Sequence, residues 1–393
     1  MPWAHMALLT PPQAAAIARG VYRLRDDTAP MVQARGQQLG CEGLFSPAPG
    51  SRFEAQSGAI FWKKLSGFGY VAQGVGPFAG DLLIATRGTQ TRSDWLANLN
   101  GAMQLGPSGL PVHAGFNEVW KSFAPQLRQM LRGRNPTRIH CVGHSLGGAL
   151  ATLNADLLTA GGVADVVLYS FGAPRTGSIV FAKSLSQRLA QQQVHRVWHP
   201  ADPVPMIPLF PYWHLPMGPG GLGVASTSNA LVSIHAHHMG SSYEPGVHGA
   251  SWDTPVPSGP PADEGQRISR WLSHTGAGQP GVAFGSATLL AMIGRALRWL
   301  LAASGQLVMG AVGLALTAGA TLLDQLAWLL GQAALMSKGM AVQLKALIGA
   351  IFRFLGRPLV GAADVTTAFL RWVLALLYES LRSLALRAMQ TAC

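Results

Sequence analysis

A serine flanked by glycines is the strongest chemical signal in the chain. Residues 143–147 read Gly-His-Ser-Leu-Gly, which matches the pattern G-x-S-x-G. An apolar run typical of a strand precedes the pattern at 139–142, and a run typical of a helix follows it at 149–158. A strand, a sharp turn and a helix are the context in which this pattern raises a nucleophilic hydroxyl above the end of a sheet. A glycine-rich turn without chemistry is the alternative, but the flanking runs favour Ser145 as a nucleophile.

Two groups near Ser145 are suited to stabilising an oxyanion. The N–H of Leu146 would point from the start of a helix at the charge that develops on a substrate. Thr89 follows the apolar run 81–86, whose end would place a backbone N–H and a hydroxyl over the carboxyl edge of the sheet. An ordinary threonine in a turn is the alternative for Thr89. The polar stretch 90–105 is a candidate flap over the site.

The elements that must position these groups alternate between strand and helix. Four apolar runs predict strands, at 81–86, 139–142, 163–171 and 194–198. The longest of them is expected to be buried on both faces, as in a parallel sheet. Three runs predict helices, at 116–132, 149–158 and 178–193. This order predicts an α/β fold with a mostly parallel, doubly wound sheet. Other segments are expected to form two short helices within 11–40, a loop at 41–57 and a hairpin at 58–75.

An acid for a catalytic triad is expected just beyond the end of a strand, after the nucleophile. Asp202 stands in that position, following the predicted strand 194–198. There it would orient a histidine and stabilise its cation. The alternative is that Asp202 caps the Pro-rich turn that follows it.

The base should follow the acid, and several histidines qualify. The candidates are His214, His235, His237, His238 and His248. The cluster at 235–238 could instead hold a metal ion, with Glu244 as a further ligand, but no cysteine lies nearby. The residues alone leave the choice among these histidines open.

The composition narrows the classes of partner. The chain has 393 residues and a formal net charge of +12, without a run of five Lys or Arg and without a recognisable nucleic-acid motif. This pattern argues against nucleic acid and favours an anionic membrane surface. The first residues lack the basic start and apolar core of a signal peptide, so synthesis in the cytoplasm is expected. Export would then depend on a dedicated secretion system.

Four blocks of the sequence together resemble the class 3 lipases, the fungal-type lipase family of α/β-hydrolases. The blocks stand in the order of that family, at 85–95, 112–116, 143–148 and 171–205. The last block contains Phe-Gly-Ala-Pro-Arg-Thr-Gly at 171–177 and Asp-Pro-Val-Pro at 202–205. The resemblance covers roughly residues 58–250.

The resemblance implies the roles of individual residues. It implies Ser145 as nucleophile, Asp202 as acid, and Thr89 with the Leu146 N–H as oxyanion hole. The base of the family precedes a tyrosine by a few residues, which implies His238, with His237 as the second choice. The mechanism implied is acyl transfer through an acyl-enzyme, without a cofactor and without a metal ion.

The final third of the chain has a different character. Residues 281–393 carry nine Lys or Arg against three Asp or Glu, and the window 299–323 has no charged residue. About 20 apolar residues span a bilayer core, so this window is a candidate transmembrane segment. A soluble helical bundle is the alternative to a membrane-associating region. Three regions are therefore predicted: a helical buttress at 1–40, a hydrolase domain at 41–275, and a basic, apolar helical region at 281–393.

These observations predict a membrane-associated serine hydrolase that cleaves acyl esters of membrane lipids, as a phospholipase A or a lipase. A hypothesis that follows is an exported antibacterial effector, neutralised by an immunity protein or escorted by a chaperone. The alternatives are a membrane-anchoring or pore-forming protein with a non-catalytic hydrolase scaffold, and a triacylglycerol lipase or thioesterase.

Overall fold

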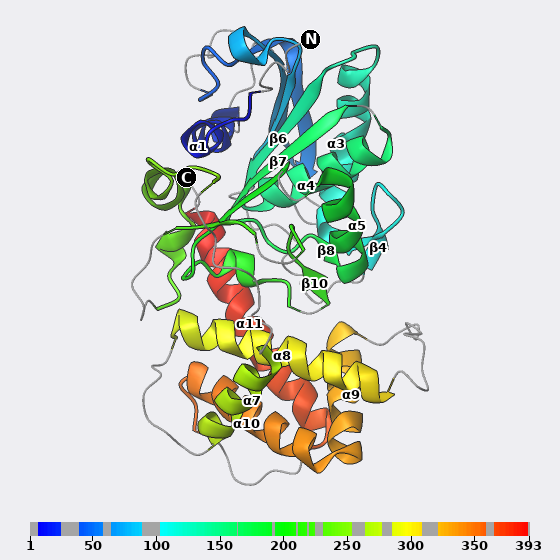
Figure 1. The fold of residues 1–393 in the computed structure, drawn as a ribbon, viewed down its shortest axis with the longest axis vertical. Coiled ribbons are helices and arrows are strands. Elements are labelled where there is room, and N and C mark those ends of the chain that lie inside the picture. The colour runs from blue at the N-terminus through cyan, green and yellow to red at the C-terminus, as the bar shows by residue number, and fades with distance from the viewer. Residues whose placement is uncertain are drawn as a thin grey trace.

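A computed structural model gives the arrangement of the chain. It describes residues 7–24, 39–57, 64–88, 103–162, 164–190, 193–209, 211–217, 220–224, 231–253, 264–276, 285–308, 321–358 and 365–391. A central sheet with helices on both faces occupies one end, and a group of helices occupies the other (Figure 1). The fold is the predicted α/β class.

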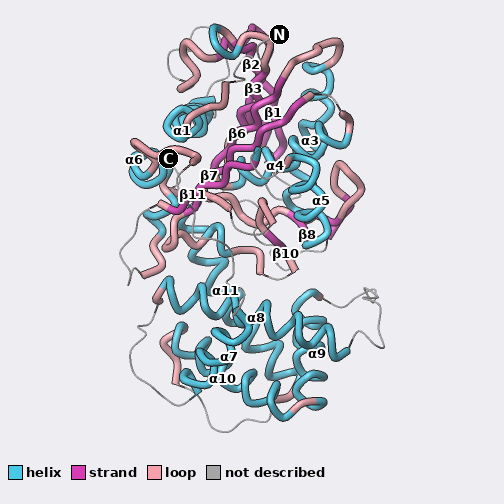
Figure 2. Tube along the Cα trace, in the orientation of Figure 1, coloured by secondary structure: helices cyan, strands magenta, loops and turns pink. Residues whose placement is uncertain are grey.

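The central sheet has seven strands in the order β1-β2-β3-β6-β7-β9-β11. Its strands are β1 (Phe45–Ser57), β2 (Lys64–Gly74), β3 (Leu82–Thr86), β6 (Arg138–His144), β7 (Asp165–Phe171), β9 (Val194–Trp198) and β11 (Leu222–Gly223). The strands from β3 to β11 pair in parallel, whereas β1, β2 and β3 pair antiparallel. A smaller antiparallel sheet has the order β10-β8-β5-β4, from β4 (Met103–Leu105), β5 (Pro111–His113), β8 (Gly177–Ser178) and β10 (Tyr212–Trp213). Figure 2 shows both sheets in magenta.

The parallel strands are apolar on both faces because helices cover both. Successive residues alternate between two buried clusters: Ile84 and Cys141 face one side, while Ala85 and Val142 face the other. The first side is covered by α3 (Ala114–Leu131), α4 (Leu146–Ala160) and α5 (Ile179–Leu189), and the second by α1 (Pro11–Gly20) (Figure 1). This double burial explains why the strands appear in the sequence as unbroken apolar runs.

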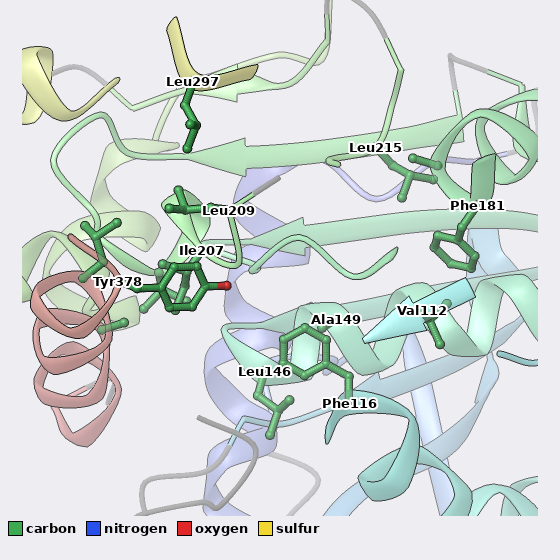
Figure 3. Packing of buried hydrophobic residues seen from close by; sticks show 14 of the residues in the cluster. Val112, Phe116, Leu146, Ala149, Phe181, Ile207, Leu209, Leu215, Leu297 and Tyr378 are labelled. Carbon is green, nitrogen blue, oxygen red and sulfur yellow. The ribbon is translucent and has the colours of Figure 1, made fainter. Parts of the chain in front are cut away.

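The remaining helices form a second layer beyond the sheet. They are α7 (Glu264–Gly276), α8 (Ala287–Val308), α9 (Leu322–Met336), α10 (Lys338–Phe354) and α11 (Thr367–Gln390). Helix α11, red in Figure 1, runs from this layer to the part of the chain that contains both sheets, within residues 7–253, which we call the hydrolase part after the sequence prediction. Figure 3 shows Tyr378 of α11 beside Ile207 and Leu209, and the Leu209 N–H donates a hydrogen bond to the Tyr378 hydroxyl. One continuous buried cluster therefore joins the two layers.

The structure differs from the sequence expectations at several points. Residues 45–57, expected as loop, form β1, which lies at the edge of the sheet where prolines without an N–H are tolerated. Of the window 299–323, residues 299–308 belong to α8, and Thr321 forms a capping box with Asp324 at the start of α9; residues 309–320 lie outside the described residues. Helix α7 packs against α10 and α8, although the predicted boundary near residue 275 grouped it with the hydrolase. Of the second short helix expected within 11–40, residues 31–38 lie outside the described residues.

Candidate active site

Ser145 lies in a strained turn between β6 and α4. Its backbone has φ 59° and ψ −134°, a region that non-glycine residues rarely adopt. Its N–H donates to the Phe171 carbonyl at 2.9 Å, which fixes the turn to the neighbouring strand. A Cβ at Gly143 would lie 2.2 Å from the Gly147 carbonyl oxygen, and one at Gly147 would lie 2.2 Å from the Thr86 oxygen. The two glycines are therefore required by close backbone approach.

A histidine and an aspartate complete a hydrogen-bonded chain with Ser145. The Nε2 of His237 lies 2.8 Å from the Ser145 Oγ, and its Nδ1 lies 2.7 Å from the Asp202 Oδ2. All three side chains are fully buried. A carboxylate can only accept, so Nδ1 carries the proton and Nε2 is left to accept the serine hydroxyl proton. This is the arrangement of a nucleophile, a general base and an orienting acid.

The structure corrects the choice of histidine. His237, the second choice of the sequence analysis, contacts Ser145 and Asp202, whereas His238 does not. The Nδ1 of His238 accepts the Ser241 N–H at 3.0 Å and caps the π-helical turn η7 (Met239–Tyr243). The reason is local: the 3-10 turn η6 (Ile234–His237) ends at His237, so the following residue has extended backbone and a different direction.

Asp202 is held by groups besides the histidine. Its Oδ1 accepts the Val204 N–H at 2.8 Å, and its Oδ2 also accepts the Tyr243 hydroxyl at 2.6 Å. The same hydroxyl accepts the His199 N–H at 3.2 Å. The capping role considered for Asp202 is thus present together with the contact to His237, and the carboxylate has two fixed donors that set its orientation.

His144 supports the base from the opposite side. Its Nε2 lies 2.9 Å from the His237 carbonyl oxygen, and its Nδ1 lies 2.9 Å from the Tyr22 hydroxyl. Burial, and then the neighbouring His237 ring, hold the pKa of His144 well below its usual value, so this ring is neutral. Because the carbonyl can only accept, Nε2 donates to it and Nδ1 accepts from Tyr22. Sequence analysis missed this role, because His144 appears only as the variable position of the G-x-S-x-G pattern.

One of the two predicted oxyanion groups can be placed. Leu146 is the first residue of α4, and N–H groups in the first turn of a helix have no acceptor within it. Thr89 and residues 90–102 of the candidate flap lie outside the described residues, and 103–105 form β4. The chain that leads to Thr89 approaches the nucleophile, because Thr86 pairs with Gly143 in the parallel register of β3 and β6.

Helix α11 supports the loops that carry the acid and the base. It packs against η6, which ends at His237, and against the 3-10 turn η5 (Val204–Met206), which directly follows Asp202 and Pro203. A soluble helical bundle is the alternative that the sequence offers for this region, but the sequence gives no signal for which turns α11 contacts.

The other candidate histidines lie away from the serine. The His214 Nε2 donates to the Pro205 carbonyl at 2.7 Å, and burial with nearby arginines lowers the pKa of that ring. His235 and His248 are exposed. Within the part of the chain that the structure describes, no three His, Cys, Asp or Glu side chains group as metal ligands would, so the metal alternative for residues 235–238 has no support there.

Ser145, His237 and Asp202 have the arrangement found in the catalytic triads of serine hydrolases, and they stand in an α/β fold. Residues 83–212 match the family model described as lipase (class 3). Over these residues the chain is similar to the class 3 lipase family.

Relatives of known name agree with this family. The chain is 34% identical to secreted mono- and diacylglycerol lipase 1 of Fusarium solani over 34% of this chain and 42% of that protein. It is 33% identical to a chloroplastic phospholipase A(1) of Arabidopsis thaliana over 33% of this chain and 34% of that protein. The chain thus spans less than half the length of these two relatives. Among solved structures, Lip2 lipase from Yarrowia lipolytica has 20% identity and a TM-score of 0.42, covering 55% of this chain and 77% of that one.

Proposed function

We propose that this protein is a carboxylic ester hydrolase that cleaves acyl esters of lipids. The observation that carries the proposal is the buried chain of hydrogen bonds from Ser145 through His237 to Asp202, at 2.8 and 2.7 Å. Each group has the partner that its role requires, because the serine is bonded to a base and the base is bonded to a carboxylate that orients it.

The proposed reaction follows from this geometry. The Ser145 Oγ attacks the ester carbonyl as His237 Nε2 takes its proton, and Asp202 stabilises the resulting cation. The tetrahedral oxyanion accepts hydrogen bonds from the Leu146 N–H and from Thr89, donors of a kind worth about 10²–10³ in rate each. The alcohol leaves with the proton from His237. Water, activated by the same nitrogen, then hydrolyses the acyl-enzyme.

Two neighbouring histidines give a matched test of this mechanism. His237→Gln should lower kcat on a soluble p-nitrophenyl ester by at least about 10³-fold, since loss of a triad member has effects of that size or more. His238→Gln, which removes only the cap of η7, should leave kcat within a few-fold of the unaltered protein. Ser145→Ala should match His237→Gln. Equal losses in the two histidine variants would contradict the assignment of the base.

The proposed substrates are acyl esters at a lipid surface, as in a phospholipase A or a lipase of partial glycerides. Support comes from the names of the two relatives, a mono- and diacylglycerol lipase and a phospholipase A(1). Phosphatidylcholine, diacylglycerol and triacylglycerol should be compared as substrates at equal surface area. A strong preference for triacylglycerol would defeat the proposal.

We also propose that the helical layer contacts the membrane. Five side chains on or between α9 and α10 make an apolar and basic surface, which we call the tail patch: Leu335, Met336, Lys338, Val342 and Lys345. Leu335 is 82% exposed and Val342 is 67% exposed, so neither contributes to the core. Exposed apolar side chains beside lysines suit an anionic lipid surface. Among the described helices, α8 has a window, Ala287–Ser304, apolar and long enough to cross a bilayer, but half of it is buried inside the protein.

A surface substitution tests this contact better than truncation, because α11 supports the site. Leu335→Ser with Val342→Ser should weaken sedimentation with phosphatidylglycerol vesicles and leave hydrolysis of the soluble ester unchanged. The matched control is Leu105→Ser with Val180→Ser, which removes two exposed apolar side chains from the hydrolase part. Equal vesicle binding by both double variants would refute the role of the tail patch.

The proposal of an exported antibacterial effector extends this lipid hydrolysis to a biological role. Expression with periplasmic targeting should be toxic for the unaltered protein and harmless for Ser145→Ala. Harmless expression of both would count against an effector. The rival idea of a pore-forming protein with an inert scaffold is tested by an active-site organophosphonate, which should label Ser145 only if the triad is functional.

A further inference from the structure

A cleft between the hydrolase part and α8 is lined by four arginines. Its volume is about 210 Å³. Arg175 and Arg196 come from the hydrolase part, and Arg295 and Arg298 come from α8. Asp202 is the only carboxylate among the lining residues that the structure describes. The cleft therefore concentrates positive charge beside the acid of the proposed triad.

The single carboxylate is not bonded to Arg175 or to Arg196. Both oxygens of Asp202 are already engaged, by His237, Tyr243 and the Val204 N–H. Arg175 donates to the Pro208 carbonyl at 2.6 Å, so its partner is neutral. A guanidinium that is largely enclosed by protein and has no anionic partner is unfavourable unless a counter-ion enters, and this applies to Arg196 and Arg175.

Arg196 is the clearest case of an unsatisfied cation. Its guanidinium lies 5.7 Å from the centre of the Trp198 ring, and among the described residues it makes no hydrogen bond and no ion pair. Protein surrounds this side chain, yet part of it remains accessible because the cleft reaches it. Burial, followed by the charge of Arg298, lowers the pKa of Arg196 to about 10. The pKa of Arg175 is likewise lowered, by burial and then by Arg298 and Arg196, which indicates that these cations lie close together.

We propose that this cleft binds a phosphate-type oxyanion, either free or as the headgroup of an anionic lipid. Guanidinium groups form paired, charge-assisted hydrogen bonds with such oxyanions. The other walls are largely apolar, with Pro205, Leu209 and Leu290 among them, and these would accommodate the hydrocarbon part of a lipid. The site is separate from Ser145 and does not depend on the proposed esterase activity.

Gly294 offers a variant that blocks the cleft without disturbing the fold. It lies in α8 on the cleft, and a Cβ placed on it would have no atom within 4 Å. Glutamate is also a better helix former than glycine. Gly294→Glu should therefore fold, place a carboxylate among the arginines and raise Tm in phosphate-free buffer, while it abolishes anion binding.

Binding should be measured by equilibrium dialysis on the full-length Ser145→Ala protein, so that no lipid is hydrolysed and catalysis cannot affect the result. The probes are inorganic phosphate and dihexanoyl phosphatidic acid. In this background, Arg196→Gln and Arg298→Gln should each weaken Kd by about tenfold, the loss expected for one charge-assisted hydrogen bond. Arg132→Gln, which removes an exposed arginine outside the cleft, is the control and should leave Kd unchanged.

The two probes separate the two sources of the anion. Saturable binding of both, with one site per chain, supports a site for free phosphate. Binding of phosphatidic acid alone supports a headgroup site. The proposal is overturned if neither probe binds at millimolar concentration, or if Gly294→Glu binds as tightly as the parent protein.

Discussion

His144 and Tyr22 should be strongly coupled in their contribution to stability. His144→Phe removes two hydrogen bonds of 2.9 Å, to the His237 carbonyl and to the Tyr22 hydroxyl, and leaves the hydroxyl with a weak contact of 3.5 Å to the carbonyl oxygen of residue 144. A buried polar group that loses its partner costs about 1–3 kcal/mol, so we expect a loss of about 2–6 kcal/mol. Tyr22→Phe leaves only the Nδ1 of His144 without a donor and should cost about 1–3 kcal/mol.

The double variant separates this explanation from a general loss of packing. With both residues changed to Phe, only the His237 carbonyl lacks its donor. The double variant should therefore be less destabilised than the sum of the single variants by about 2 kcal/mol, within the range of coupling between contacting residues. The measurement is the free energy of unfolding in urea for all four proteins at pH 7.5.

An additive result would refute the reasoning. If the loss of stability in the double variant equals the sum of the two single losses within about 0.5 kcal/mol, His144 and Tyr22 act independently. The hydrogen bonds from Tyr22 through His144 to the His237 carbonyl would then not be coupled in energy. Activity gives a second readout. His144→Phe should lower kcat on a soluble ester more than Tyr22→Phe does, because only the first change releases the His237 backbone.

Two further predictions concern stability. The protein should lose stability as the pH falls below about 6.5, because His144 and His195 are buried as neutral rings and burial lowers the folded-state pKa of His195 to about 4. Below that pH the unfolded chain binds protons that the native state does not, which costs about 1.4 kcal/mol of stability per pH unit for each histidine. An unchanged Tm between pH 7 and pH 5 would contradict this prediction. Gly349→Ala in α10, where a Cβ meets no atom within 4 Å, should stabilise the protein by about 0.5–1 kcal/mol. Gly331→Ala in α9 should not stabilise it, because the Cβ would lie 2.9 Å from the Thr367 Oγ1. Equal shifts in Tm for the two variants would show that helix propensity, and not the available space, determines the change in stability.

The parallel sheet and the nucleophile turn could be predicted because their signals are local. Strands buried on both faces appear as apolar runs, and the close approach at Gly143 and Gly147 is recorded in the sequence itself. Strand β1 was missed because its prolines indicate a loop, and only its place at the edge of the sheet makes them acceptable.

The histidine could not be chosen from the sequence, because His237 and His238 are adjacent. Their directions differ only because a 3-10 turn ends at the first and a π-helical turn is capped by the second. The hydropathy of the window 299–323 does not show where α9 starts, because a local capping box at Thr321 determines that position.

The contact of α11 with η5 and η6 also sets an order of events during synthesis. His237 is translated about 130 residues before the helix that packs against its turn. A nascent chain that has reached only α10 already contains Ser145, Asp202 and His237. It lacks the helix that packs against η5 and η6. The two turns that carry the acid and the base therefore gain this support only once α11 has been made and has docked. Proteolytic cleavage ahead of α11 that releases this helix would remove the same support. A cut far from the site in sequence would therefore lower the activity.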